Sequence, residues 1–365
     1  MMSWSPTARR RAVSGLAQLW CREEWRSSEH ADSIKRVLFG MLTDQDEVNR
    51  LHAAKVVPIL AEDDATALAL IRRRLLDERH QTVAARLMNR LARFRDSESV
   101  EVDSVIAEVI TVEPWVSALQ VTSRNGRDEC IESAVGLVLY LALRGRTATA
   151  SGLVDTWFRD PTATEAGRRA ISATRSWLEL GTDRAEERSR AFALLHLAAS
   201  TLAHQRIADH CEAKSVRDIH LCADDIVADI YFGSGAYTQP GEPARPLTPG
   251  FAEEAFNTLD LLAGFKSPQT VHHAVETLAY LAPADPRRAF LPVNKIVNAG
   301  DPYTYDPLAA DTVVALIQRY LAEFREQVTD DADLLTAIRS VLDAFVRVGW
   351  PAGVALSYRL GDAFR

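Results

Sequence analysis

Apolar residues return at helical intervals along almost the whole chain, and this periodicity is the strongest constraint on its fold. In residues 83–91 they occupy positions i, i+1, i+4, i+5 and i+8, and residues 313–324 and 334–346 show similar spacings. Such spacings place the apolar side chains on one face of a helix, about a third of its circumference wide. No run of alternating polar and β-branched residues is long enough to predict a strand. The chain is therefore predicted to be all-α.

Polar and helix-breaking residues interrupt the pattern at intervals of about 15 to 25 residues. Examples are Asp44-Gln45-Asp46, Arg144-Gly145, Asp160-Pro161 and Asp285-Pro286. Aspartate at these places can cap the next helix, and proline suits the first helical turn. Breaks this short between helices of this length predict that consecutive helices run antiparallel.

Three helix starts share a weak internal similarity. The segments 46–54, 77–85 and 267–274 each combine a polar cap, a valine and a small residue ahead of a leucine-rich face. This pattern resembles the start of a helix in HEAT repeats, in which small residues let the next helix approach closely. The resemblance implies an irregular α-solenoid of antiparallel helix pairs, with a repeat period that varies along the chain.

A segment rich in glycine and proline divides the helical pattern. Residues 233–250 read GSGAYTQPGEPARPLTPG, which cannot form a helix and is long for a connection in a compact array. We therefore expect an N-terminal helical-repeat array over residues 1–232, a loop or linker over residues 233–250, and a C-terminal array with a terminal cap over residues 251–365.

Aromatic residues in the breaks are candidate contacts for a protein partner. Tyr237 lies in the glycine- and proline-rich segment, and Tyr303 and Tyr305 lie in a shorter break at residues 298–306. Aromatic side chains on loops that a rigid scaffold positions are frequent binding residues. The competing interpretation is that both segments only connect helices.

The last 55 residues contain the most recognisable motif. Two predicted helices are followed by Gly349-Trp350-Pro351 and by a short final helix ending in Phe364-Arg365. Gly349 is suited to end one helix, Trp350 to cover the end of the core, and Pro351 to begin the next helix. The arrangement resembles the C-termini of some large bacterial NTP-binding proteins with helical tails, including ones in antiphage defence. The resemblance implies that the chain is the helical, non-catalytic part of such an NTPase or a separate partner of one.

Charge is distributed unevenly along the chain. Residues 1–100 hold 17 Lys+Arg against 14 Asp+Glu, whereas the remainder holds 25 against 36, which gives a total net charge of −8. A long acidic stretch argues against general nucleic-acid binding, because such binding depends on neutralising phosphates. The N-terminal part nevertheless has clustered arginines, and nucleic-acid binding through an arginine face is a first alternative function. Its candidate contacts are Arg72, Arg73, Arg86, Arg90 and Arg93.

Residue clusters that could support catalysis or metal binding have unsuitable spacing. Five soft ligands fall within 19 residues, but adjacent residues on a helix point about 100° apart, and structural zinc sites pair ligands two to four residues apart around a tight turn. These ligands are His204, His210, Cys211, His220 and Cys222. The acidic residues Asp224, Asp225 and Asp229 are interpreted as a solvated face, and the adjacent His272 and His273 as packing residues. We predict no bound metal.

The chain also lacks the glycine-rich loops that bind nucleotides, and it shows no nucleophile elbow. We predict no cofactor and no catalytic residue. A HEAT-like enzyme, such as a DNA glycosylase or a bilin lyase, is a second alternative function. A buried carboxylate with a perturbed pKa in a concave cleft would support it.

The favoured hypothesis is a non-catalytic helical-repeat scaffold that binds a protein partner. Its four cysteines form no disulfide pattern, and it has neither a signal peptide nor an apolar stretch long enough for a membrane span, so the chain is expected to be cytoplasmic. The 37 arginines against five lysines are typical of a GC-rich bacterial genome.

Overall fold

The computed structural model of the chain consists of helices. It describes residues 8–61, 63–97, 100–113, 115–119, 129–179, 184–207, 213–237, 245–248, 250–299 and 307–363. Within these residues every regular element is a helix, and all are α-helices apart from the 3-10 segment η1 (Ala92–Ser97) and short turns. The prediction of an all-α protein is confirmed.

The helices group into two compact units. We call Met1–Val154 with Thr164–Arg169 the N-terminal unit, and Asp155–Ala163 with Ala170–Arg365 the C-terminal unit. Two helices, α10 (Ala148–Arg159) and α11 (Glu165–Ala173), contribute residues to both units. The division at residues 233–250 that the sequence suggests stays a prediction, and that segment joins two helices of the C-terminal unit.

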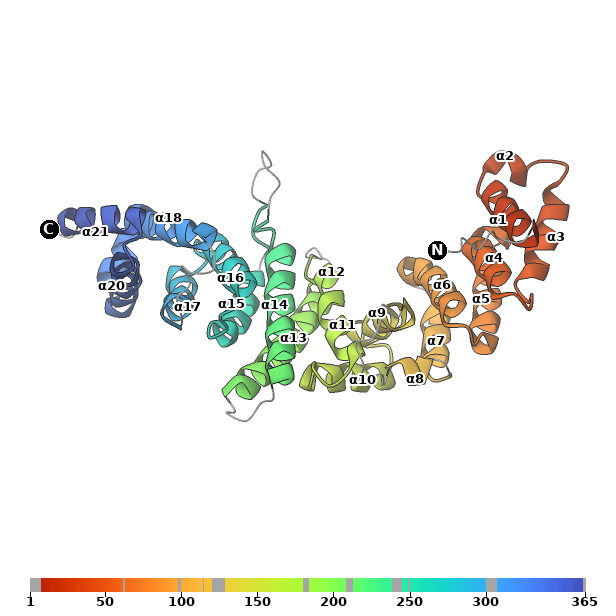
Figure 1. Cartoon of the computed structure of the whole chain (residues 1–365), viewed down its shortest axis with the longest axis horizontal. Coiled ribbons are helices and arrows are strands. Elements are labelled where there is room, and N and C mark those ends of the chain that lie inside the picture. The colour runs from red at the N-terminus through yellow and green to blue at the C-terminus, as the bar shows by residue number, and fades with distance from the viewer. Residues whose placement is uncertain are drawn as a thin grey trace. The chain divides into compact units, whose positions relative to one another are not determined.

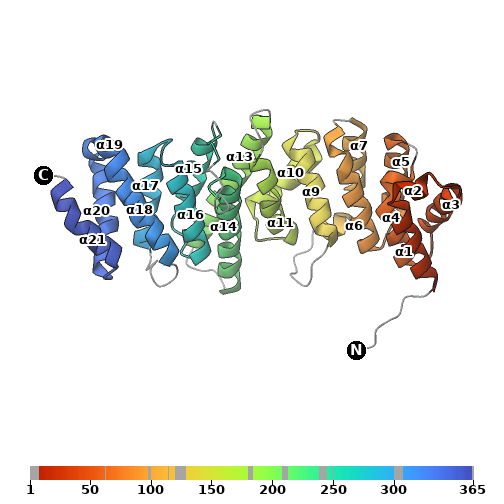
Figure 2. The same cartoon turned by 90° about the horizontal axis from the view of Figure 1, so that it is seen from above.

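In the N-terminal unit, the helices pack in two rows. One row is α1, α4, α6 and α9, in which each helix packs on the next, and α3, α5 and α7 pack against it as the second row (Figures 1 and 2). Consecutive helices therefore alternate between rows, as expected for antiparallel pairs. The bounds are α1 (Ala8–Trp20), α2 (Glu23–Arg26), α3 (Ala31–Met41), α4 (Glu47–Leu60), α5 (Asp64–Asp77), α6 (Gln81–Leu91), α7 (Val100–Val109), α8 (Trp115–Leu119) and α9 (Glu129–Leu143).

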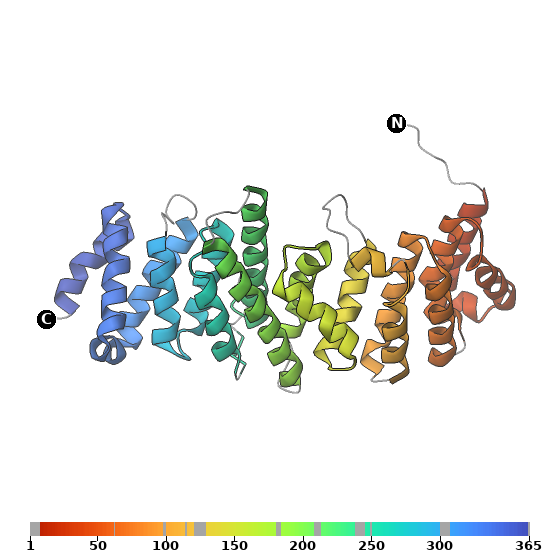
Figure 3. The same ribbon diagram turned by 90° about the horizontal axis from the view of Figure 1, so that it is seen from below.

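The C-terminal unit has the same two-row arrangement. Helices α12, α14, α16, α18 and α21 follow one another in one row, and α13, α15, α17 and α20 do so in the other; the green helices α13 and α14 are the longest (Figures 2 and 3). The bounds are α12 (Arg175–Leu178), α13 (Ala185–Ile207), α14 (Ala213–Ser234), α15 (Phe251–Leu262), α16 (Pro268–Leu281), α17 (Pro286–Ala299), α18 (Pro307–Glu323), α19 (Arg325–Asp330), α20 (Ala332–Arg347) and α21 (Pro351–Ala363).

Side-chain caps begin several of these helices at the breaks that the sequence marks. Asp46 accepts a hydrogen bond from the amide of Val48 at 2.9 Å at the start of α4. Ser267 accepts one from the Thr270 amide at 3.2 Å, immediately before Pro268 opens α16. Such caps satisfy amide groups that have no partner inside the helix.

The turn between α20 and α21 follows the prediction made from Gly349 and Pro351. Gly349 has a φ of 72°, a left-handed conformation that a residue with a Cβ adopts only at a cost. The amide of Gly349 donates to Val346 at 3.0 Å and that of Trp350 donates to Phe345 at 3.0 Å, which is the Schellman pattern of a helix end. Pro351 then begins α21.

Each unit buries its own apolar core between its two rows. Leu38, Ile71 and Leu87 are fully buried in the N-terminal unit, and Phe251, Phe290 and Phe345 are fully buried in the C-terminal unit. Among the described residues, no helix combines the length and the apolar character needed to cross a lipid bilayer.

Candidate functional site

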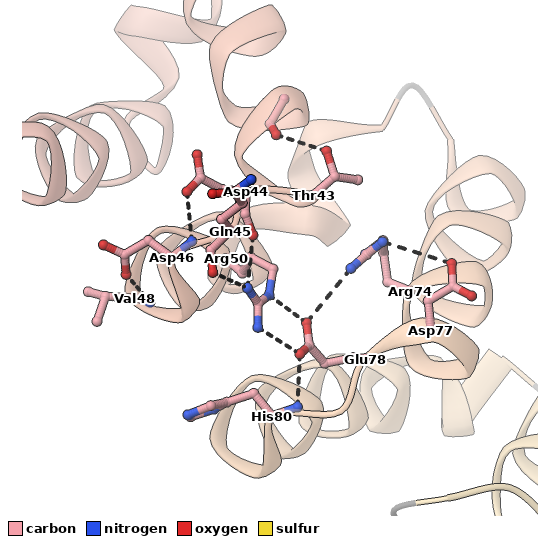
Figure 4. A network of polar contacts seen from close by, with 11 residues as sticks. Thr43, Asp44, Gln45, Asp46, Val48, Arg50, Arg74, Asp77, Glu78 and His80 are labelled. Atoms are coloured by element: carbon pink, nitrogen blue, oxygen red, sulfur yellow. Dashed lines mark hydrogen bonds and ion pairs between the residues drawn. The ribbon is translucent and has the colours of Figure 1, made fainter.

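A polar cleft of about 510 Å³ opens on the N-terminal unit, where the connection between α3 and α4 meets the connection between α5 and α6 (Figure 4). Charged side chains of both signs line it, which makes it a candidate site for binding or catalysis. The lining residues are Thr43, Asp44, Arg50, Arg74, Asp77, Glu78, Arg79 and His80.

The buried pair of Arg50 and Glu78 dominates this cleft. Arg50 Nε lies 2.8 Å from Glu78 Oε2, and Arg50 Nη2 lies 3.0 Å from Glu78 Oε1. The remaining nitrogen, Nη1, donates to the backbone carbonyls of Asp44 and Gln45 at 2.8 and 3.0 Å. Arg50 therefore joins the end of α5 to the loop before its own helix, as Figure 4 shows.

The carboxyl groups of the cleft are held ionised by the groups that surround them. Burial alone would raise the pKa of Glu78, but hydrogen bonds from Arg50 and from the His80 amide outweigh it, and the pKa of Glu78 lies below its usual range. The pKa of Asp44 is also lowered, first by the Asp46 amide, while Asn49 and Arg9 act in the same direction. Carboxylates this well partnered are poor proton donors or acceptors, so we interpret the cleft as a structural network.

Three of the predicted arginines lie near one another on α6 and η1, where Arg86 and Arg90 are partly exposed and Arg93 is exposed. One side of α6 is buried through Val83, Leu87 and Leu91. Burial lowers the pKa of the Arg90 guanidinium, and the neighbouring charges of Arg86 and Arg93 lower it further. Arg90 Nε is buried and has no hydrogen-bond partner. We call Arg86, Arg90 and Arg93 the arginine cluster.

The other two predicted arginines, Arg72 and Arg73, lie on α5, in the second row of the N-terminal unit. Arg72 pairs with Glu108 of α7, with Nε and Nη2 at 2.6 and 2.8 Å from its two carboxylate oxygens. Arg73 is exposed to solvent. Both residues therefore lie on α5, whereas the arginine cluster lies on α6 and η1.

Tyr237 belongs to a group of aromatic side chains at the end of α14. It is 48% exposed, and its ring lies edge-on to those of Phe232 and Tyr231, with centroids 5.4 and 6.1 Å away. Tyr231 stacks on His273 of α16 at 4.7 Å, and the Arg175 guanidinium lies 4.1 Å from the centroid of the Phe232 ring. We call these five residues the aromatic patch.

Of the aromatic patch, the sequence predicts only Tyr237 as a contact. Tyr231 and Phe232 are adjacent aromatic residues just before the loop, and they are a local signal for the same place. The sequence indicates His273 only as a packing residue, and Arg175 comes from a distant segment with no local signal. The other predicted contacts, Tyr303 and Tyr305, lie outside the described residues.

The soft ligands around α14 are not drawn together among the residues that the structure describes. His204 Nδ1 lies 2.6 Å from the Ser200 carbonyl, the His220 ring packs edge-on against Phe265, and Cys222 is buried. His210 and Cys211 lie outside the described residues. Within the described ranges, no three His, Cys, Asp or Glu residues are placed to hold a metal ion.

Asp229 is a buried carboxyl rather than a member of a solvated face. Only 5% of it is exposed, and burial raises its pKa to about 8, with the Asp225 charge acting in the same direction. The Thr174 hydroxyl lies 2.7 Å from the Ile171 carbonyl oxygen and 3.1 Å from Asp229 Oδ2. The Thr174 hydroxyl is the donor in both contacts, and its contact with Asp229 acts against burial by lowering the pKa of that carboxyl. The prediction of a solvated carboxylate fails at this position because α14 turns it towards α12. It fails also at Asp224, which is buried and accepts hydrogen bonds from the Ser267 and Thr270 hydroxyls.

Comparison with known proteins adds no family to this description. No protein-family model matches the chain, and no curated protein sequence matches it significantly. Function is therefore inferred from the geometry of the cleft, the arginine cluster and the aromatic patch.

Proposed function

We propose that this protein is a HEAT-like helical-repeat scaffold that binds a protein partner and has no chemistry of its own. The two-row packing in each unit supports the repeat interpretation, because a helix pair buries its apolar face only against its neighbours. The pair of Arg50 and Glu78 adds support, since it joins the two successive helix starts, at residues 46–54 and 77–85, that resemble each other in sequence.

The observation that carries the binding proposal is the aromatic patch. Tyrosine and arginine are the residues most enriched at the energetic centres of protein interfaces, especially when neighbouring groups hold them rigidly. Tyr237 is half exposed but is braced by two rings, and Arg175 is fixed over Phe232. A partner that covers Tyr237 would therefore gain contact area without first having to order that side chain.

The chemistry of the partner is suggested by the C-terminal resemblance. Gly349-Trp350-Pro351 and the helix that follows resemble the helical tails of large bacterial NTP-binding proteins, including antiphage-defence ones. An NTPase of that kind is therefore the first partner to test.

Replacing Tyr237 by alanine tests the binding proposal. The full chain, its Y237A variant and a matched Y358A variant, which removes an 80% exposed tyrosine from α21, are used as baits in extracts of the cells that encode the chain. We expect one protein to be retained by the unmodified chain and by Y358A, and to be depleted at least about tenfold with Y237A. With that partner purified, Y237A should weaken the Kd about 30-fold, or about 2 kcal/mol. Identical proteins on all three baits would contradict the proposal.

Nucleic-acid binding and a HEAT-like enzyme are the two alternative functions. Of the five arginines considered for nucleic acid, Arg72 is neutralised by Glu108, which leaves the exposed Arg73 and the arginine cluster as the support for that function. Asp229 has the perturbed pKa that an enzyme would use, but its carboxyl is buried against Thr174 and offers no open site for a substrate.

A further inference from the structure

The arginine cluster gathers three guanidinium groups near the end of α6. Arg86 and Arg90 follow the i, i+4 spacing that keeps side chains on one helical face, and Arg93 follows in the 3-10 segment η1. The charges of Arg86 and Arg93 lie close enough to Arg90 to lower the pKa of its guanidinium, after burial. The helix beneath them is rigid, because its other face is packed against α4 and α9.

Several other surface arginines of this protein have acidic partners. Arg72 pairs with Glu108 at 2.6 Å, Arg159 with Asp155 at 2.7 Å, and Arg319 with Glu323 at 2.7 Å. Among the described residues, no carboxylate pairs with any member of the arginine cluster. Three like charges therefore lie together here without a described carboxylate beside them.

Arg90 supplies a second and independent observation. Its Nε is shielded from solvent but donates no hydrogen bond. A buried donor without an acceptor is unfavourable, and the charges of Arg86 and Arg93 on either side add repulsion. An oxyanion bound against the terminal nitrogens of these guanidinium groups would reduce the repulsion.

We infer that the arginine cluster binds the phosphodiester backbone of a nucleic acid, through about three phosphates and without reading bases. Guanidinium groups bind phosphate oxygens in a two-pronged geometry. A duplex is rigid and repeats its charge at fixed spacing, so it can contact a group of arginines on a rigid helix with little ordering cost. An acidic peptide offers similar charge but must be ordered on binding. The acidic residues of the rest of the chain weaken this attraction little where they are more than about 10 Å away, because salt screens them.

Salt dependence measures how many phosphates are contacted. Binding of the full chain to a fluorescent 20-base-pair duplex is followed by anisotropy at 50 and 150 mM KCl. Three contacts predict a slope of about −2.7 for log K against log salt, which is an increase in Kd of about 20-fold over that range. A single strand of the same length should give a shallower slope of about −2.1.

Two matched triple variants identify the site. R86Q/R90Q/R93Q should weaken duplex binding at 50 mM KCl at least about tenfold and make it nearly independent of salt. R26Q/R36Q/R339Q removes the same charge from exposed positions on α2, α3 and α20, and it should change Kd less than about twofold. Circular dichroism and thermal unfolding check that both variants are folded.

Three outcomes would overturn the inference. They are no duplex binding at 50 mM KCl, equal losses in the two triple variants, and displacement of the duplex by polyglutamate as effectively as by unlabelled duplex at equal charge. The last outcome would assign the cluster to an acidic protein segment instead. This inference goes beyond the protein-binding proposal and can fail separately from it, because Y237A lies in the other unit and should leave duplex binding unchanged.

Discussion

Replacing Arg50 by methionine tests whether its buried pair with Glu78 joins successive helix pairs of the N-terminal unit. Methionine keeps an apolar stem but removes two hydrogen bonds to Glu78 and two to the carbonyls of Asp44 and Gln45. Only 16% of the Arg50 side chain and 3% of the Glu78 side chain are exposed, so water in the cleft, Arg74 at 3.7 Å and the His80 amide replace the lost partner only in part. Removing one member of a buried ion pair typically costs about 3–5 kcal/mol. We expect R50M to fall in that range.

The pair of Arg72 and Glu108 provides the control, because its geometry is nearly the same while its environment differs. Its two contacts measure 2.6 and 2.8 Å, compared with 2.8 and 3.0 Å for the buried pair. The Arg72 and Glu108 side chains are 48% and 39% exposed. Exposed pairs contribute about 0–1 kcal/mol, so R72M should cost no more than that. The difference between the two variants measures the effect of burial.

Hydrogen exchange of the α4 and α6 amides, followed by mass spectrometry, is the suitable assay. It reports the opening free energy of the N-terminal unit alone, whereas global unfolding of a chain with two units need not be two-state. The pKa of Glu78 is lowered in the folded protein, so its stabilising contribution is present above the unfolded pKa of about 4.5 and is lost as the pH falls through the folded value. The penalty of R50M should therefore shrink in acid. A cost below about 1 kcal/mol at pH 7, or equal costs for R50M and R72M, would refute the reasoning.

Two further variants test the C-terminal unit. D229N should be more stable than the unmodified protein, by a margin that grows by about 1.4 kcal/mol per pH unit between pH 4 and pH 8. The reason is that the pKa of Asp229 is raised to about 8 in the folded protein, so the unmodified protein loses folding free energy as the pH rises. Urea unfolding at pH 5 and pH 7 measures this margin, and a pH-independent difference would contradict a raised pKa at Asp229. G349A should destabilise the α20–α21 turn by about 1 kcal/mol, since alanine is strained at a φ of 72°. Hydrogen exchange of the Trp350 amide should then become faster, and an unchanged exchange rate would show that the turn tolerates a Cβ.

Features that depend on neighbours in the sequence could be predicted. Helix formation, capping by Asp46 and Ser267, and the Gly349-Pro351 turn all follow from local rules. The shared face of Arg86 and Arg90 follows from helical spacing alone. These predictions hold because the interactions behind them join residues only a few positions apart.

Features that depend on distant segments could not be predicted. Glu108 lies 36 positions from Arg72, and nothing in the sequence near Arg72 indicates that its charge is neutralised. Thr174 lies 55 positions from Asp229, so the pattern of acidic residues on α14 suggested a solvated face where the structure buries a carboxyl. Both pairings are set by how one helix packs on another, which a single sequence does not specify.

Arginine is abundant throughout this chain, so the presence of an arginine at one position indicates little about function. Whether a carboxylate lies beside that arginine is more informative. Arg50 and Arg90 occupy neighbouring helices of the same row, and both are partly withdrawn from solvent. Glu78 supplies Arg50 with two acceptors and an opposite charge, and the resulting pair belongs to the fold. Arg90 meets two further arginines instead and keeps an unused donor. A row of phosphates would give the arginine cluster the opposite charge that Glu78 gives Arg50, and this contrast within one unit is what a bound nucleic acid would resolve.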